Sequence, residues 1–127
     1  MTTGERGATT TELAIVFPVL VALILAVVQF GIWYHAAAVA RAAASEGVRA
    51  MLVVDGTEAD GRRRTQEFLD QLGRGVIESP AMSTSRSGDV AVVEIRASAP
   101  ELLPGLRLAV TARAETPIER FRAADER

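Results

Sequence analysis

The side chains that most often carry out catalysis or hold metals are scarce in this chain of 127 residues. It has no cysteine and one histidine, His35, which excludes a thiol nucleophile, a disulfide framework and a zinc finger. The motifs of serine hydrolases, phosphate-binding loops, zinc proteases and dinucleotide-binding folds are also missing from the sequence. The sequence therefore predicts that the protein is not an enzyme and has no cofactor, metal or small-molecule substrate.

The charges give no sign of a nucleic-acid partner. The formal net charge is −2, and the one basic run is Arg62-Arg63-Arg64. This run is short for a patch that binds nucleic acid or anionic lipid, so we interpret it as a solvated helix face.

Glu12 has an unusual position among the carboxylates. No formally charged residue follows it until Arg41. Ala8 lies four residues earlier, so in a helix the two residues share a face. A carboxylate in the first turn of a helix complements the helix dipole, whereas one in the centre of a bilayer costs about 2.5–3.5 kcal/mol or more. Glu12 is therefore either an interfacial acid or an acid paired with a cation at the membrane edge.

Residues 13–34 form the most apolar part of the sequence. Their 22 residues include only one strongly polar side chain, Gln29, and end in Trp33 and Tyr34. As a helix they would span roughly 33 Å, enough to cross a hydrocarbon core of about 30 Å. Aromatic side chains are enriched at membrane interfaces, and we expect His35 to be interfacial as well. The sequence predicts a transmembrane helix in preference to a buried helix of a soluble protein.

A cleaved secretory signal is an alternative interpretation of the same segment. The apolar stretch is longer than a usual signal core, and residues 1–7 carry one acid and one base instead of a basic region. Small residues between positions 36 and 44 could still offer a cleavage site. Arg6 on one side and Arg41 and Arg49 on the other leave the orientation open by charge alone.

One set of residues within about the first 50 positions has a familiar arrangement: Gly7, Thr11-Glu12-Leu13-Ala14, Pro18, Gln29-Phe30-Gly31 and the stretch from Ala43 to Arg49. In these residues the sequence resembles the TadE-like family, pilin-related proteins of the tight-adherence (Flp-type) pilus system. Its flank is also similar to prepilin signals, which a membrane-embedded aspartyl peptidase cuts after Gly to leave Glu at the fifth mature position. The resemblance implies cleavage between Gly7 and Ala8 and pairing of Glu12 with the N-terminal ammonium of a neighbouring subunit. The family usually has an aromatic residue after the Glu, where this sequence has Leu13.

Several residues of the long helix suggest a packing role. Pro18 lacks an N–H, which predicts a kink or local unwinding, and Gln29 could either hydrogen-bond across helices or snorkel. Small residues recur every fourth position after Tyr34, which lets helix backbones approach closely. Good helix propensity alone could explain this pattern, but we favour a surface that stacks on other helices of an assembly. The expected packing residues are Pro18, Gln29, Ala36, Ala40, Ala43, Ala44 and Gly47.

The remainder of the chain predicts a small α+β head. Asp55-Gly56 should end the long helix, and an amphipathic helix should run from about Thr57 to Leu72, before Gly73. Its apolar face, which we expect to cover the sheet, consists of Thr65, Phe68, Leu69 and Leu72.

Alternation of apolar and polar residues predicts two or three antiparallel strands. The first, at about residues 76–83, contains Pro80 and should lie at an edge. Turn residues at positions 87–89 lead into a strand at 90–98, and a loop with Pro100 and Pro104-Gly105 precedes a strand at 106–114. A charged tail follows Pro117.

These elements predict a pilin-like organisation. A leader (residues 1–7) precedes a transmembrane and extended helix (8–54) and an extracytoplasmic head (55–127). The first hypothesis is a TadE-like minor pseudopilin, anchored in the cell membrane by one span with its N-terminus in the cytoplasm. Its partners would be the prepilin peptidase, other pilins and the assembly platform. The second hypothesis is an unprocessed, signal-anchored module whose external head binds a partner.

Overall fold

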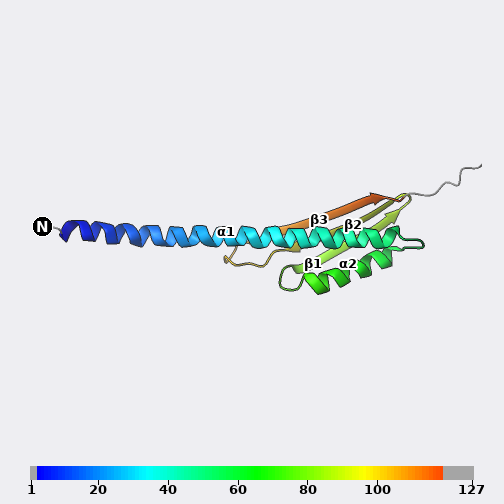
Figure 1. Ribbon diagram of the computed structural model, residues 1–127, viewed down its shortest axis with the longest axis horizontal. Coiled ribbons are helices and arrows are strands. Elements are labelled where there is room, and N and C mark those ends of the chain that lie inside the picture. Colours follow the sequence, from blue (N-terminus) through cyan, green and yellow to red (C-terminus); the bar gives the residue numbers. More distant parts are fainter. Residues whose placement is uncertain (1–2, 119–127) are drawn as a thin grey trace, which may run out of the picture.

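The computed structural model describes residues 3–118 and shows an α+β protein with one very long helix (Figure 1). The head lies along the second half of this helix, while the first half extends away from it (Figure 1). The predicted fold class is confirmed. The elements are α1 (Thr3–Leu52), α2 (Glu58–Leu72), β1 (Glu78–Ser87), β2 (Val90–Ser98) and β3 (Ala109–Pro117).

Helix α1 is continuous over 50 residues, with Pro18 inside it. The helix assignment has no break at Pro18, so the predicted local unwinding is wrong, and the ribbon of α1 runs straight along its length (Figure 1). A transmembrane-type helix tolerates a proline when local adjustment satisfies the freed carbonyl. The helix ends at Leu52, slightly before the predicted Asp55-Gly56. The chain then turns through Asp55, which has a φ of 62°.

Helix α2 has the bounds that the sequence predicted. Thr57 is its N-cap and Gly73 its C-cap, and Thr57 and Asp60 form a reciprocal capping box. Its buried residues are Gly61, Thr65 and Leu69, spaced four apart. Phe68 is only half-buried and Leu72 is exposed, so the predicted apolar face is rotated toward Gly61.

The three strands form an antiparallel sheet in the order β1-β2-β3. The predicted bounds of β2 are confirmed, β3 lies a few residues later than expected, and β1 begins at Glu78 and continues to Ser87. β1 is an edge strand, as Pro80 predicted. An irregularity in the register between Glu78 and Ala81 takes up this proline, which has no N–H to donate. The charged tail expected after Pro117 lies, apart from Ile118, outside the described residues.

The core of the head is formed where α1 crosses the sheet. Val93 and Ile95 of β2 and Val110 of β3 are buried against the second half of α1. Met51, in the last turn of α1, is buried in the same core. The prediction that residues of 57–72 supply the cover is therefore only partly right, because α1 covers β2 and β3 while α2 lies beside α1 and near β1. The core draws on residues on both sides of the expected boundary at position 54.

Candidate functional site

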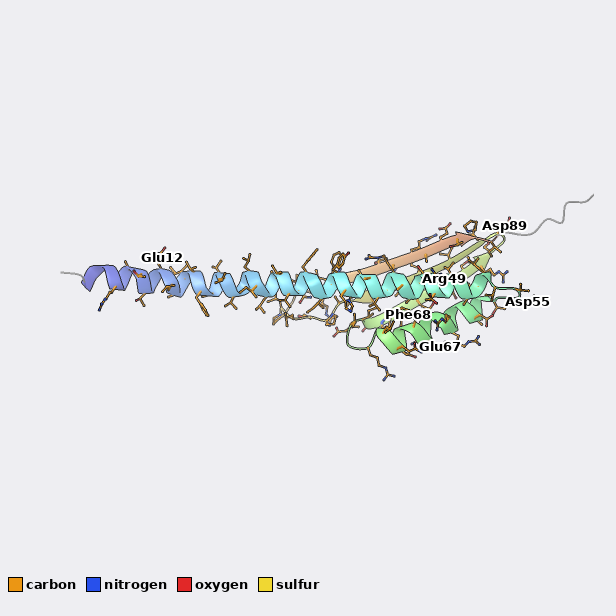
Figure 2. All side chains as sticks on the ribbon, in the orientation of Figure 1. Glu12, Arg49, Asp55, Glu67, Phe68 and Asp89 are labelled. Atoms are coloured by element: carbon orange, nitrogen blue, oxygen red, sulfur yellow. The ribbon has the colours of Figure 1, made fainter. Side chains whose placement is uncertain are left out.

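The residues that resemble a processing signal lie in the first turns of α1. Gly7, Ala8 and Glu12 are all helical and exposed, and Ala8 and Glu12 are one turn apart. The Thr11 hydroxyl donates to the carbonyl oxygen of Gly7 at 2.9 Å. Glu12 projects from the helix near the end opposite Asp55 and Asp89 (Figure 2). Glu12 makes no ion pair with any side chain that the structure describes.

The segment after Glu12 presents large apolar side chains all round the helix. Among the described residues, α1 contains the one stretch that is long and apolar enough to cross a membrane. Nearly all of its large side chains are exposed within residues 3–118, so it is a candidate membrane anchor. The exposed ones are Leu13, Ile15, Val16, Phe17, Val19, Leu20, Val21, Leu23, Ile24, Val27 and Val28.

Gln29 marks the point where α1 meets the head. Its side chain is almost fully buried, and its Nε2 donates to the carbonyl oxygen of Pro100 at 3.0 Å. Its Oε1 accepts from the N–H of Leu102 at 2.8 Å. Both hydrogen bonds go to the loop between β2 and β3, so the expectation that Gln29 bonds to another helix or snorkels is wrong.

The aromatic residues of the predicted membrane interface lie at the same level. The Trp33 indole N–H donates to the carbonyl oxygen of Ala109 at 3.0 Å, at the start of β3. Phe30 and Trp33 are in contact, with ring centroids 5.6 Å apart. Phe30, Tyr34 and His35 are exposed. Over residues 3–118 no group of three or more potential metal-ligating side chains is found around His35 or elsewhere.

The ridge of small residues is buried inside the chain. Ala36, Ala40, Ala43 and Ala44 are completely buried in the core of the head, so this ridge is not available to stack on other subunits as we expected. Gly47 lies against α2, and a Cβ at this position would come within 2.0 Å of the Thr65 hydroxyl oxygen. Small side chains in α1 therefore permit a close approach of the chain's own sheet and of α2.

The basic run of α2 is partly neutralised by neighbouring carboxylates. Arg63 pairs with Asp60 at 2.9 Å, and Arg64 pairs with Glu46 of α1 at 3.3 Å and with Glu67 at 3.7 Å. Arg62 lines an open hollow between α2 and Met82 of β1, whose other polar lining residues include Glu58, Glu67 and Asp70. The mixture of charges fits the predicted solvated helix face.

The candidate site lies in the part of the chain that matches a known protein family. Residues 7–49 match the family model described as TadE-like protein. This TadE-like segment begins at Gly7 and covers Glu12, the apolar stretch and the small-residue ridge, and it confirms the resemblance seen in the sequence. It amounts to about a third of the chain and ends before α2. No curated protein and no solved structure shows a significant match to the chain.

The contact between the TadE-like segment and the β2–β3 loop was missed from the sequence. Pro100 and Pro104-Gly105 predicted a loop before a strand at 106–114, but nothing in their pattern gave the partner of that loop. The one available signal was Gln29, an amide in an apolar stretch, which must find a hydrogen-bond partner when it is removed from water.

Proposed function

We propose that this protein is a TadE-like minor pseudopilin, a structural or assembly component of a tight-adherence, type IV-like pilus or a related secretion machine. The match of residues 7–49 to the TadE-like family carries this proposal, because it spans Gly7, Glu12 and the candidate anchor together. The first half of α1 is apolar and exposed, and it is joined to a small α+β head. This arrangement is consistent with a subunit that is held in a membrane and assembles through its N-terminal segment. The partners proposed are a prepilin peptidase, other pilins and an assembly platform.

The peptidase would cut between Gly7 and Ala8. Gly7 lies inside α1, and a glycine lowers the stability of a helix by about 1 kcal/mol relative to alanine, which favours local opening for cleavage. Mass spectrometry of the protein from native membranes should show Ala8 as the first residue. Gly7→Leu should abolish this maturation. Gly31→Leu is the matched control, because a Cβ at Gly31 also meets no atom within 4 Å. Normal maturation of Gly7→Leu would contradict the proposal.

Glu12 would act in assembly. After cleavage, its carboxylate would lie one turn from the new α-ammonium of Ala8, at a depth where a neighbouring subunit can offer the same group. Breaking a desolvated charge pair leaves one charge unmatched, at a cost of about 3–5 kcal/mol. Glu12→Ala should be inserted and cut normally but should crosslink poorly to partner pilins. Glu12→Gln should lose crosslinking as well if charge is the cause, and equal crosslinking in all three proteins would reduce Glu12 to an interfacial acid.

The proposed orientation places the N-terminus in the cytoplasm and the head outside the cell membrane. A reporter that is active only outside the cytoplasm, fused after Arg127, should be active. A stable but inactive fusion would overturn this topology.

The competing function is an unprocessed, signal-anchored binding module. It retains Met1 or Thr2 as the first residue in native membranes, so the same mass-spectrometric measurement separates the two. A nearby gene cluster for a secretion ATPase and a prepilin peptidase would favour the pseudopilin.

A further inference from the structure

The β2–β3 loop, residues 99–108, extends along α1 beyond the end of the sheet, toward the first half of the helix (Figure 1). Antiparallel neighbours are usually joined by two to five residues, so this connection is long. It carries two exposed leucines, Leu102 at 44% and Leu106 at 40% exposure, with Leu103 half-buried between them. An apolar loop of this length beside a candidate membrane span requires a physical explanation.

The loop has a defined shape, so its leucines are displayed in fixed positions. Its base is closed by a hydrogen bond from the N–H of Ala99 to the carbonyl oxygen of Leu108, at 3.0 Å. An inner turn joins the N–H of Leu106 to the carbonyl oxygen of Leu103, at 3.1 Å, and the N–H of Gly105 donates to the Glu101 carboxylate. Gly105 has a φ of 84°, which a residue with a Cβ adopts only with strain.

The loop lies at the level where the membrane span of α1 ends. A hydrocarbon core of about 30 Å corresponds to about 20 helical residues, which from Leu13 reaches approximately position 32. Gln29, which holds the loop, is therefore inside the last turn of the span. Phe30 and Tyr34 are exposed at the same level, where aromatic side chains are typical of the interface.

Gln29 and two backbone groups of the loop satisfy one another's hydrogen bonds at this depth. Gln29 bonds to Pro100 and Leu102 through both its amide nitrogen and its amide oxygen. Irregular backbone is tolerated at membrane depth only where its polar groups find partners, and Gln29 provides two. Glu101 is also paired with Arg107, at 3.6 Å, and Arg107 is long and highly exposed, which allows it to reach headgroup phosphates.

We propose that the β2–β3 loop is a second membrane contact, in which Leu102 and Leu106 enter the apolar boundary of the leaflet nearest the head. This inference rests on the proposed membrane anchoring of α1. The head is then attached to the membrane at two points, α1 and the loop. These two contacts fix the height of the head above the membrane and its rotation about the axis of α1. Lipid is the partner that contacts Leu102 and Leu106, because these side chains lie at the same membrane depth as the end of the lipid-facing stretch of the anchor.

The absence of cysteine from the chain makes the test direct, because an introduced cysteine is unique. The full chain is reconstituted in phosphatidylcholine–phosphatidylglycerol vesicles with a fluorescent label on Leu102→Cys or Leu106→Cys. Both labels should be quenched strongly by doxyl-labelled lipids and several-fold less by aqueous iodide than a label on Ser87→Cys. Ser87 lies beside Asp89, which is at the far end of the head (Figure 2).

A label on Phe17→Cys separates this proposal from the proposed anchor. If Phe17 is quenched by lipid while positions 102 and 106 resemble Ser87, the anchor holds and the loop contact is wrong. If position 17 is also exposed to water, the anchor itself is wrong, and the loop contact fails with it. Protection of positions 102 and 106 from both quenchers, dependent on the protein-to-lipid ratio, would assign the leucines to a second copy of the chain and overturn the lipid contact.

The single tryptophan gives a second measurement without a label. Trp33 is tied to the start of β3 beside the loop, so brominated lipids should quench its fluorescence in the wild type. The double variant Leu102→Asp, Leu106→Asp should lower this quenching several-fold, because the carboxylates lift the loop toward water. Val54→Asp is the control, since Val54 is exposed beyond the opposite end of the head. Unchanged quenching in the double variant would contradict the proposal.

Discussion

The two halves of α1 belong to one unbroken helix but have opposite surroundings. From Leu13 to Val28 the helix carries Leu, Ile, Val and Phe side chains, nearly all of which are exposed in the part of the chain that the structure describes. From Ala36 to Met51 its inner face is mostly alanine and is completely buried by the sheet and α2. In Figure 2 the first half stands alone and the second is flanked by the head on two sides.

The comparison shows that side-chain size, more than hydrophobicity, decides what the helix can pack against. Alanine and glycine offer little surface of their own, but they bring the backbone close enough for Val93 and Ile95 of β2 to fill the interface. Large branched side chains keep other elements at a greater distance from the helix axis. They also expose apolar surface, which lipid can cover so that it does not contact water. One helix therefore serves as an anchor at one end and as a core element at the other.

The largest expected effect comes from a pair of isoleucines, one in each environment. Ile95 is completely buried in the head, whereas Ile15 is 66% exposed on the anchor. Ile95→Ala should lower the free energy of unfolding of the head by about 2–5 kcal/mol, through lost burial and the remaining cavity. Ile15→Ala should leave it unchanged. Hydrogen exchange of the β2 amides in detergent micelles measures both, and equal effects would mean that the head and the anchor unfold together.

Gln29, at the boundary of the two halves, has the next largest expected effect. Gln29→Leu leaves the Pro100 carbonyl and the Leu102 N–H without their partner, which costs about 1–3 kcal/mol when such groups stay buried. Gln66→Leu is the matched control, since Gln66 bonds to Asp70 on the exposed surface of α2. Proteolysis within residues 99–108 should increase in the first variant and not in the second. Equal protection would show that the loop is held by its own turns.

Two glycines of α1 should respond with opposite signs. A methyl group on Gly47 meets Thr65 and the backbone of Gly61, so Gly47→Ala should destabilise the head by about 1–3 kcal/mol, reduced by about 1 kcal/mol of helix propensity. Gly31→Ala meets nothing and should only strengthen the helix. Thermal unfolding followed by circular dichroism distinguishes them. Adding Thr65→Ala to Gly47→Ala should restore part of the stability, and no restoration would place the strain elsewhere.

Local signals predicted much of the fold, because each was decided within a few residues. The bounds of α2 follow from the Thr57–Asp60 capping box and Gly73, and β2 follows from strict alternation between a turn and a proline. The partners of α1 could not be predicted in this way. Small residues at every fourth position indicate close approach to some surface, and a helix, a sheet of the same chain and another subunit all satisfy that pattern. Gln29 likewise indicated a hydrogen bond without naming the loop, which lies more than 70 residues later.

The smallest predicted effect concerns the capping box of α2, which touches only the head. Hydrogen bonds from the backbone N–H and the hydroxyl of Thr57, with a contribution from Arg63, hold the pKa of Asp60 below its ordinary value.

Because the pKa is lower in the folded state, Asp60 stabilises the head fully above the unfolded value of about 3.9. This contribution is lost as the pH falls through the lower, folded pKa. The stability difference between the wild type and Asp60→Asn should therefore shrink as the pH falls below about 4, as measured by urea unfolding of the head. Thr57→Ala removes the hydroxyl that donates to Asp60 but keeps the backbone N–H, which is the larger cause of the shift, so adding Asp60→Asn to it should produce a smaller pH-dependent difference. An equally large difference in the Thr57→Ala background would show that the backbone N–H of Thr57 and Arg63, and not the hydroxyl, lower the pKa of Asp60. The anchor half of α1 should keep its helical amide protection throughout, since the capping box lies at the other end of the molecule.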